Sequence, residues 1–473
     1  MRNVHIAAAI AVALGTTAAV QAAPTPTQAM SAAHNVYMAG SSAAVNGVVA
    51  FLETTVCGGS FSVFTTPTTS PGLPDFRAVS CSPASGEPFN GSTLTVWYRP
   101  EGGSVVGVFP VINNTSIRQL NMTSAGCVTS AASSAASASY NCTGVAGTTP
   151  GNGTDDSFGT GTFTHNVDIG ISDLEPGAFA SISKGTTKAW AGGGNNDPVG
   201  TYNASFTGAD QGVSAVQAMT HATVFQQVFG FIVNTNLGIT SLPKEQIAAI
   251  FDAAVLDWSQ VATGANSSAT VTSTSTPIVV CNREIGSGTR GSTDVFLNGD
   301  GCLGPSSPNV LTDIAGVPVG TVTEPADNFQ TAAELDCVNR NPNSIGYVSI
   351  DNFSKLQGTT VAPNANAIAV SGTSATQIGA ATGLYSYVYE ASMNYNKTGA
   401  SSDGSTFYTD LVPILQAVDT TPKSGQILAI PGQPSGNTAQ IPLQQGSPST
   451  EFTSLFSRGG GAGNSCNPLT PAL

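Results

Sequence analysis

The hydrophobic positions of this chain fall into short apolar runs that alternate with amphipathic stretches. Five runs of strand length predict buried strands, at Leu94–Tyr98, Val167–Ile171, Val228–Val233, Pro277–Val280 and Ile345–Val348. A helix is predicted over Leu242–Phe251, because a proline and an acidic residue stand in its first turn. The alternation of strands with helices predicts an α/β fold.

Two stretches rich in Ser, Ala, Gly and Thr interrupt this pattern, at Thr123–Asp156 and Lys184–Gly212. Such composition is typical of surface insertions rather than of buried elements. We therefore expect the fold to continue on either side of both insertions.

The first 22 residues have the pattern of a secretory signal peptide. Arg2 precedes an apolar run from Ile6 to Val20, and small residues follow, with cleavage expected after Ala22. A membrane anchor is the alternative, but the apolar run is short for a membrane span. We expect an exported protein, either periplasmic or secreted.

The chain contains eight cysteines, and none of them forms a Cys-x-x-Cys motif. In an exported protein, structural disulfides are the expected state of such cysteines. Proximity along the chain favours three pairs and leaves one longer link. The expected pairs are Cys57 with Cys81, Cys127 with Cys142, Cys302 with Cys337, and Cys281 with Cys466.

The charge balance is acidic, with 14 Lys and Arg against 28 Asp and Glu, for a formal net charge of −14. A nucleic-acid partner is not expected, because phosphate-backbone binding needs a basic surface. The overall field also repels a small anion. Any anion site must therefore act locally, through main-chain N–H groups, hydroxyls and an arginine.

One such site is predicted in the stretch VVCNREIGSGTRGSTDVF, which begins at Val279. A strand end is followed by the turn Gly286–Thr289 and by a helix with its body at Gly291–Leu297. Glycines allow close approach of a ligand, and the first N–H groups of the helix lack partners within it. Arg283 is placed to donate two hydrogen bonds to an oxyanion. From this motif alone, however, an ordinary helix-capping turn is the favoured interpretation.

Three other strand ends carry similar polar groups. Ser42 stands in a Gly-Ser-Ser turn before an apolar helix, Ser104 at a comparable helix start, and Asp173 at the end of NVDIGISD. Ligands of open α/β sheets bind at such carboxyl ends of strands. From these residues alone, a loop or helix cap is the favoured interpretation of Asp173.

Together these stretches resemble the phosphate-binding proteins of bacterial phosphate ABC transporters, from about Asn35 to about Gln416. The most specific element is the Arg-x-x-Gly-Ser-Gly-Thr pattern of Arg283–Thr289. VDIGISD is similar to the family's Asp-apolar-Gly-x-Ser-Asp, and NSIGYVSIDN to its Ile-Gly-Tyr-Val strand. Two positions depart from the family: Ala43 replaces an aromatic residue, and Ile285 stands where an acid is frequent.

The resemblance implies a phosphate-binding set drawn from all four turns. Its members would be Ser42, the Ala43 N–H, Ser104, Asp173, Arg283, Ser287, the Gly288 N–H and Thr289. Asp173 would be the acceptor and the other groups would be donors. No cofactor and no metal are implied.

The resemblance also implies a two-lobed type II periplasmic binding protein fold with two crossing hinge strands. Lobe I would comprise residues 31–224 and 391–473, and lobe II residues 225–390. The ligand would lie between the lobes and draw them together. A monomer is expected, with an inner-membrane ABC permease as the partner that the resemblance implies.

Two other classes of function remain open. A secreted phosphatase of the same fold is one, although no Gly-x-Ser-x-Gly motif is present and His34, His165 and His221 are scattered. An extracellular structural or adhesive protein is the other, which the glycine content and low charge favour. Trp97 and Trp258 are expected to be core or loop anchors rather than sugar platforms, as is Trp190.

Overall fold

The computed structural model describes most of the chain between residues 22 and 415 and three short segments beyond it. The described ranges are 22–58, 60–66, 76–100, 103–114, 116–122, 126–130, 137–142, 163–176, 220–264, 267–283, 286–298, 331–415, 440–442, 456–457 and 468–471. Residues 1–21 of the predicted signal peptide, the whole second insertion, Trp190, Ile285, Cys302 and Cys466 lie outside these ranges.

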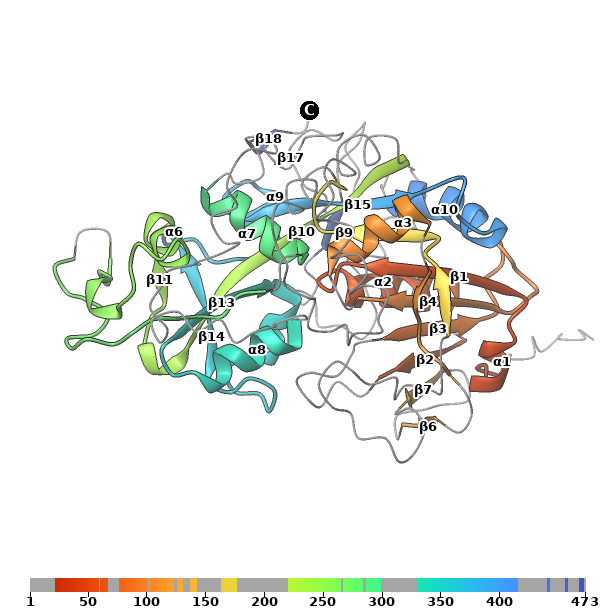
Figure 1. Ribbon diagram of the computed structural model, residues 1–473, viewed down its shortest axis with the longest axis horizontal. Helices are drawn as coiled ribbons and strands as arrows, with labels where there is room; N and C mark the ends of the chain where they lie inside the picture. Colours follow the sequence, from red (N-terminus) through yellow and green to blue (C-terminus); the bar gives the residue numbers. More distant parts are fainter. Residues whose placement is uncertain are drawn as a thin grey trace, which may run out of the picture.

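The described residues form a mixed sheet of 14 strands with helices packed around it, and two separate two-stranded sheets, β5-β8 and β17-β18. The main path of the sheet runs β11-β14-β10-β15-β9-β1-β4-β3-β2-β7-β6, and β12, β13 and β16 pair off this path. Figure 1 shows two halves, one of green and teal elements and one of red and orange elements. The predicted α/β fold is confirmed.

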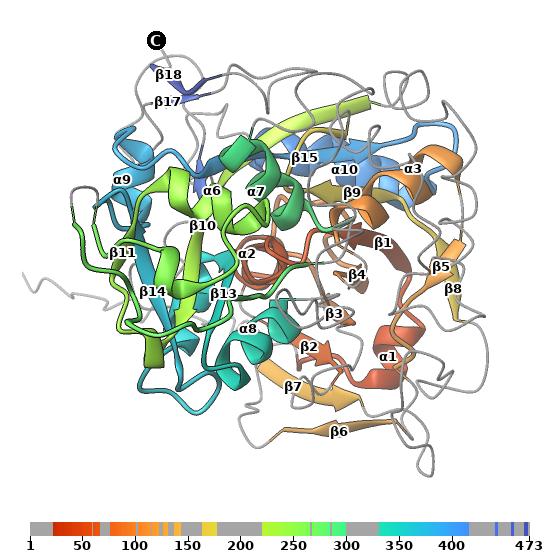
Figure 2. The same ribbon diagram turned by 60° about the vertical axis from the view of Figure 1, so that its left-hand side comes forward.

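The red and orange half is built from the N-terminal part of the chain. Helix α10, which comes much later in the sequence, also packs in this half. Its strands are β1 (His34–Gly40), β2 (Phe61–Thr65), β3 (Arg77–Cys81), β4 (Leu94–Arg99), β5 (Ser116–Arg118), β6 (Cys127–Thr129), β7 (Ser137–Cys142), β8 (Thr164–Asn166) and β9 (Ile169–Ser172). Its helices are α1 (Pro26–Met30), α2 (Val45–Phe51) with a π-helical continuation (Leu52–Val56), a 3₁₀ turn η2 (Ser104–Gly107), α3 (Phe109–Asn113) and α10 (Ser402–Leu415). Strands β6 and β7 lie at the lower edge of this half in both views (Figures 1 and 2).

The green and teal half contains the middle of the chain. Its strands are β11 (Ser241–Leu242), β12 (Val279–Val280), β13 (Ser344–Ser349) and β14 (Ala365–Val370). Its helices are α6 (Lys244–Phe251), α7 (Gly288–Asn298), α8 (Thr331–Arg340) and α9 (Gln377–Ala381), with 3₁₀ turns η4 (Thr235–Leu237), η5 (Trp258–Gln260) and η6 (Ile350–Lys355). Short strands β16 (Gln440–Pro442), β17 (Phe456–Ser457) and β18 (Thr470–Pro471) follow later in the chain.

Two long antiparallel strands connect the halves. Strand β10 (Thr220–Asn234) pairs with β15 (Val388–Tyr395) along its first part and with β13 and β14 along its last part. From Val224 to Asn234 every residue of β10 is buried. The predicted crossing of two strands is confirmed. The proposed lobe boundaries at 224/225 and 390/391 fall inside these strands and stay a prediction.

Most of the predicted elements agree with the structure in type, and several differ in extent. The apolar run Val228–Val233 is only part of β10, which is buried from Val224 onward and begins at Thr220, where the strand is more exposed. The turn at Ser104 opens a 3₁₀ turn rather than an α-helix. Trp97 and Trp258 are buried, and their indole N–H groups donate to the main-chain oxygens of Leu120 and Asn343 at 3.1 and 2.8 Å. Both are therefore core residues, as expected.

Two of the expected disulfides are confirmed, and the other two expected pairings are wrong. Cys57 is bonded to Cys81, and Cys127 is bonded to Cys142. The second bond links the paired strands β6 and β7, which form the described part of the first insertion. Cys337, however, is bonded to Cys281, which contradicts both the expected link of Cys337 to Cys302 and that of Cys281 to Cys466. The reason is topological, because β12 pairs with β13 and α8 packs on β13, which leaves the two Cα atoms 5.9 Å apart.

None of the helices in the described part of the chain combines the length and apolar character that a membrane crossing requires.

The Cys281–Cys337 pairing is open to a direct test. Proteolysis of the protein, purified without a reducing agent, should release a disulfide-linked peptide pair that contains Cys281 and Cys337. Mass spectrometry before and after reduction identifies the pair. A linked pair containing Cys302 and Cys337 would contradict the structure.

Candidate functional site

Three glycines bring the polar turns of the first half into contact. Gly40 ends β1 with φ +129°, and a Cβ there would lie 2.9 Å from the main-chain carbon of Ile171. A Cβ on Gly170 would lie 2.8 Å from Cα of Gly107. Only residues without a side chain allow main chains to approach this closely. As a result, the ends of β1 and β9 and the turn η2 meet at one point.

Asp173 lies at this meeting point and is buried. Its carboxylate accepts hydrogen bonds from the hydroxyl of Ser41, after β1, and from that of Thr289, in α7, at 3.4 Å. Its N–H donates to the Ser104 hydroxyl at 2.9 Å. One carboxylate therefore contacts hydroxyl donors from both halves of the protein.

Burial raises the pKa of the Asp173 carboxyl to about 6. The Ser41 hydrogen bond opposes this rise most strongly, followed by the positive charge of Arg283 and by the hydroxyls of Ser104 and Thr289. These groups stabilise the ionised form without fully offsetting the loss of water. At neutral pH the carboxyl is mostly ionised and acts as a hydrogen-bond acceptor.

Arg283 approaches the same region from the other half. Its side chain is buried, and the guanidinium donates to the hydroxyls of Ser42 at 3.1 Å and Thr331 at 3.4 Å. Those two hydroxyls are themselves 3.4 Å apart. A buried guanidinium beside neutral hydroxyls provides positive charge in a place that water reaches poorly.

The Gly-Ser-Gly-Thr turn packs directly against the first half. The N–H of Val105 donates to the main-chain oxygen of Gly286 at 3.0 Å. A Cβ on Gly288 would lie 2.7 Å from Oδ2 of Asp173 and would collide with the Ser104 hydroxyl. The start of α7 therefore faces Asp173 and Ser104, and glycine is needed at this position for steric reasons.

The structure brings most of the predicted site residues together. Ser42, Ser104, Asp173, Arg283, Gly288 and Thr289 meet where the two halves touch. The hydroxyl of Ser287 instead accepts from the N–H of Arg290 at 3.3 Å, as a cap at the start of α7. Ala43 is buried, and its main-chain oxygen accepts from the side chain of Gln227 in β10 at 3.3 Å. Their roles in ligand binding stay predictions.

Two residues of the site were not identified from the sequence. Ser41, not Ser42, donates to Asp173, although both belong to the Gly-Ser-Ser turn that the sequence singles out. Thr331 opens α8 and contacts both Arg283 and Ser42. Nothing in the local sequence marks Thr331, because its neighbours in space come from segments far away in the chain.

This arrangement suits a small oxyanion that still carries a proton. Hydroxyls, an arginine and the start of a helix supply donors, and one carboxylate supplies an acceptor. In the part of the chain that the structure describes, no group of three or more His, Cys, Asp and Glu side chains is placed to hold a metal ion.

Comparison with known proteins identifies the family. Residues 168–407, half of the chain, match the family model described as a PBP superfamily domain. The matched segment contains Asp173, Arg283 and both connecting strands. No curated protein gives a significant match.

Several solved structures are similar at low identity. One is a candidate phosphate ABC transporter substrate-binding protein with bound phosphate from Clostridium perfringens, at 13% identity and TM-score 0.43, covering 87% of this chain and 100% of that one. A phosphate-binding protein from Stenotrophomonas maltophilia has 13% identity and TM-score 0.35, with 77% and 79% covered. An ABC-type phosphate transport receptor from Vibrio cholerae has 16% identity and TM-score 0.30, with 56% and 78% covered. At these TM-scores, the ligand of this chain has to be inferred from its own residues.

The raised pKa of Asp173 predicts a specific pH dependence of stability. Because ionising this buried carboxyl costs free energy, the folded protein favours the protonated form of Asp173. The stability gained from this preference is complete below the ordinary pKa of 3.8 and is lost as pH rises through about 6. Asp173→Asn removes this titration. Measured without phosphate, the unfolding free energy of the wild type minus that of Asp173→Asn should fall by about 2 kcal/mol between about pH 4 and about pH 7. A difference that does not change with pH would contradict the assignment.

Proposed function

This chain belongs to the PBP superfamily, and from that membership we propose that it is an exported solute-binding protein for inorganic phosphate. The observation that carries the proposal is the buried Asp173. Its carboxylate accepts hydrogen bonds from hydroxyls of both halves, and the positive charge of Arg283 favours its ionised form. Phosphate would lie between the halves, where these groups meet.

The chemistry of the site favours phosphate over sulphate. At neutral pH phosphate retains at least one proton, which it can donate to the Asp173 carboxylate, whereas sulphate has none. Sulphate could not donate a hydrogen bond to this buried carboxylate and would also be repelled by it. The missing charge-assisted hydrogen bond and the repulsion together cost a few kcal/mol, roughly a hundredfold or more in affinity.

Transport is the setting in which we place this binding. The N-terminal pattern supports export to the periplasm or the medium, and we propose delivery of phosphate to an inner-membrane ABC permease by a monomer. Strands β10 and β15 would act as the hinge, because they are the described segments that pass continuously between the halves. Opening at the hinge would give phosphate access to the buried site.

The first test is calorimetry with the mature protein and its Arg283→Ala variant. Phosphate should bind the wild type without turnover, and Arg283→Ala should weaken binding about a hundredfold, since charge-assisted hydrogen bonds worth ~3 kcal/mol are lost. Arg340→Ala is the matched control, because Arg340 is largely exposed and pairs with Asp336 on the surface of α8. Its affinity should equal that of the wild type.

Two results, one from calorimetry and one from a phosphatase assay, would overturn the proposal. Absence of binding heat with phosphate would exclude a phosphate-binding function. Steady release of phosphate from p-nitrophenyl phosphate by the wild type would instead identify a phosphatase.

Selectivity gives the second test. An amide at position 173 donates a hydrogen bond to a fully deprotonated oxyanion and removes the repulsion, so Asp173→Asn should raise the affinity for sulphate relative to phosphate by tenfold or more, ~1.4 kcal/mol. The ratio of the two affinities is measured at constant ionic strength. Asp336→Asn, a surface carboxylate of α8, is the control. An unchanged ratio in Asp173→Asn would assign selectivity to other residues.

A further inference from the structure

The main chain of Arg283 is held by two side chains. Its N–H donates to the hydroxyl of Tyr347 at 3.0 Å, and its carbonyl oxygen accepts from Nη1 of Arg290 at 2.8 Å. Tyr347 belongs to β13 and Arg290 to α7, so the two contacts reach Arg283 from different elements. Both of its main-chain polar groups are therefore fixed by specific side chains.

Tyr347 forms hydrogen bonds with three residues of this region. It is buried, and its hydroxyl also donates to the side-chain oxygen of Asn282, which precedes Arg283. Its own N–H donates to the carboxylate of Glu334 in α8 at 3.2 Å. Burial raises the pKa of the Tyr347 hydroxyl well above its usual value, so the group stays neutral and keeps its donor role. Strand β13, helix α8 and the arginine segment are thus linked at one side chain.

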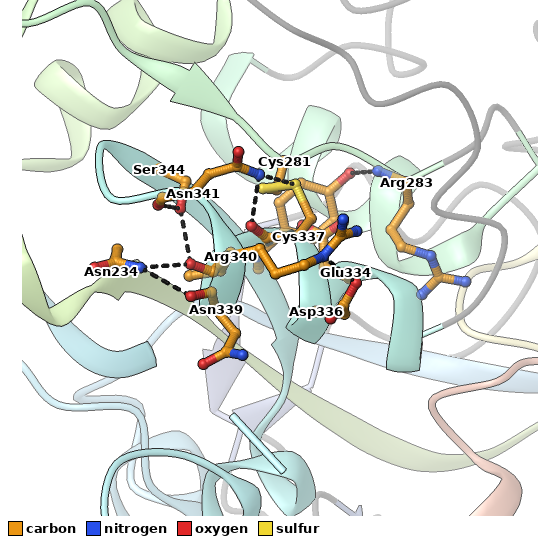
Figure 3. Close-up of a disulfide and its surroundings, with 12 residues drawn as sticks. Asn234, Cys281, Arg283, Glu334, Asp336, Cys337, Asn339, Arg340, Asn341 and Ser344 are labelled. Carbon is orange, nitrogen blue, oxygen red and sulfur yellow. Dashed lines mark hydrogen bonds and ion pairs between the residues drawn. A yellow bond between two sulfur atoms is a disulfide. The ribbon is translucent and has the colours of Figure 1, made fainter. Parts of the chain in front are cut away.

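The Cys281–Cys337 disulfide supports the same segment from behind (Figure 3). Cys281 lies two residues before Arg283, and its N–H donates to the main-chain oxygen of Ile345 at 2.8 Å. Cys337 lies in α8, the helix whose first residue, Thr331, contacts the guanidinium. Figure 3 shows the Arg283 side chain pointing away from the disulfide, so the bond anchors the main chain and leaves the guanidinium directed elsewhere.

We propose that Tyr347 is a positioning residue for the anion site: its hydroxyl fixes the main chain of Arg283 and thereby aims the guanidinium at the oxyanion. This inference rests on the proposed function. Tyr347 itself does not touch the ligand. A guanidinium gives two well-directed hydrogen bonds only when its Cα and first torsions are fixed, and an unfixed arginine loses entropy when it binds. Arg290 and the disulfide assist by holding the two sides of the same segment.

Tyr347→Phe is the direct test, because it removes only the hydroxyl and preserves the ring. Phosphate binding should weaken about tenfold, measured by calorimetry. Tyr385→Phe is the matched control: Tyr385 is also buried, and its hydroxyl has no hydrogen-bond partner among the described residues. Its phosphate affinity should stay at the wild-type value. Wild-type affinity in Tyr347→Phe would overturn the proposal.

A double-mutant cycle separates positioning from general support of the fold. In an Arg283→Ala background, Tyr347→Phe should weaken phosphate binding no further, because there is no guanidinium left to aim. An equal tenfold loss in both backgrounds would show that Tyr347 acts by another route and would overturn the proposal. If Tyr347→Phe does not fold, Arg290→Gln removes the other main-chain contact and is subject to the same cycle.

Hydrogen exchange tests the inference independently of phosphate. The Arg283 amide should exchange faster in Tyr347→Phe than in the wild type or in Tyr385→Phe, since its acceptor is gone. Unchanged exchange would refute the positioning role. Faster exchange in a protein whose wild type shows no phosphate binding would leave the contact established and would reject the proposed function alone.

Discussion

The antiparallel pairing of β10 with β15 is the contact on which the arrangement of the whole molecule depends. Eight residue pairs between Thr220–Tyr395 and Val228–Val388 join the strands that pass between the halves. Beyond Val228, β10 continues as a strand of the other half, paired with β13 and β14. Because the same strand belongs to both halves, their turns meet in a defined place.

At that place, the structure solves an electrostatic difficulty. The chain has a net charge of −14, and one of its negatively charged side chains, Asp173, is buried at the site. Burial alone would favour a neutral carboxyl, but hydroxyls from both halves and the nearby guanidinium of Arg283 limit the rise of its pKa to about 6. The site thus depends on oriented local groups, which act at short range where the overall field of the protein matters little.

The same donors also explain why glycine recurs around the site. Hydrogen bonds near 3 Å between groups on three different segments require their main chains to lie almost in contact. Gly40 and Gly170 permit this within the first half, and Gly288 permits it between the halves. A side chain at any of these positions would push apart segments whose close approach brings Ser41, Ser104 and Asp173 together.

Local sequence was sufficient to predict the α/β class, the type of the main elements and the turns that carry polar groups. Each depends on interactions within a few residues, such as the apolar runs of β4 and β13 or the glycines before α7. The resemblance extended these predictions to Asp173 and Arg283 and to two crossing strands.

Only tertiary structure decided that Ser41 contacts Asp173, that Thr331 joins the site and that Cys281 bonds to Cys337. The contacts of Ser41 and Thr331 depend on which side of a turn or helix faces a neighbouring segment. The disulfide joins residues that are 56 positions apart in the sequence. A local pattern carries no information about such distances, because packing of the sheet and helices sets them.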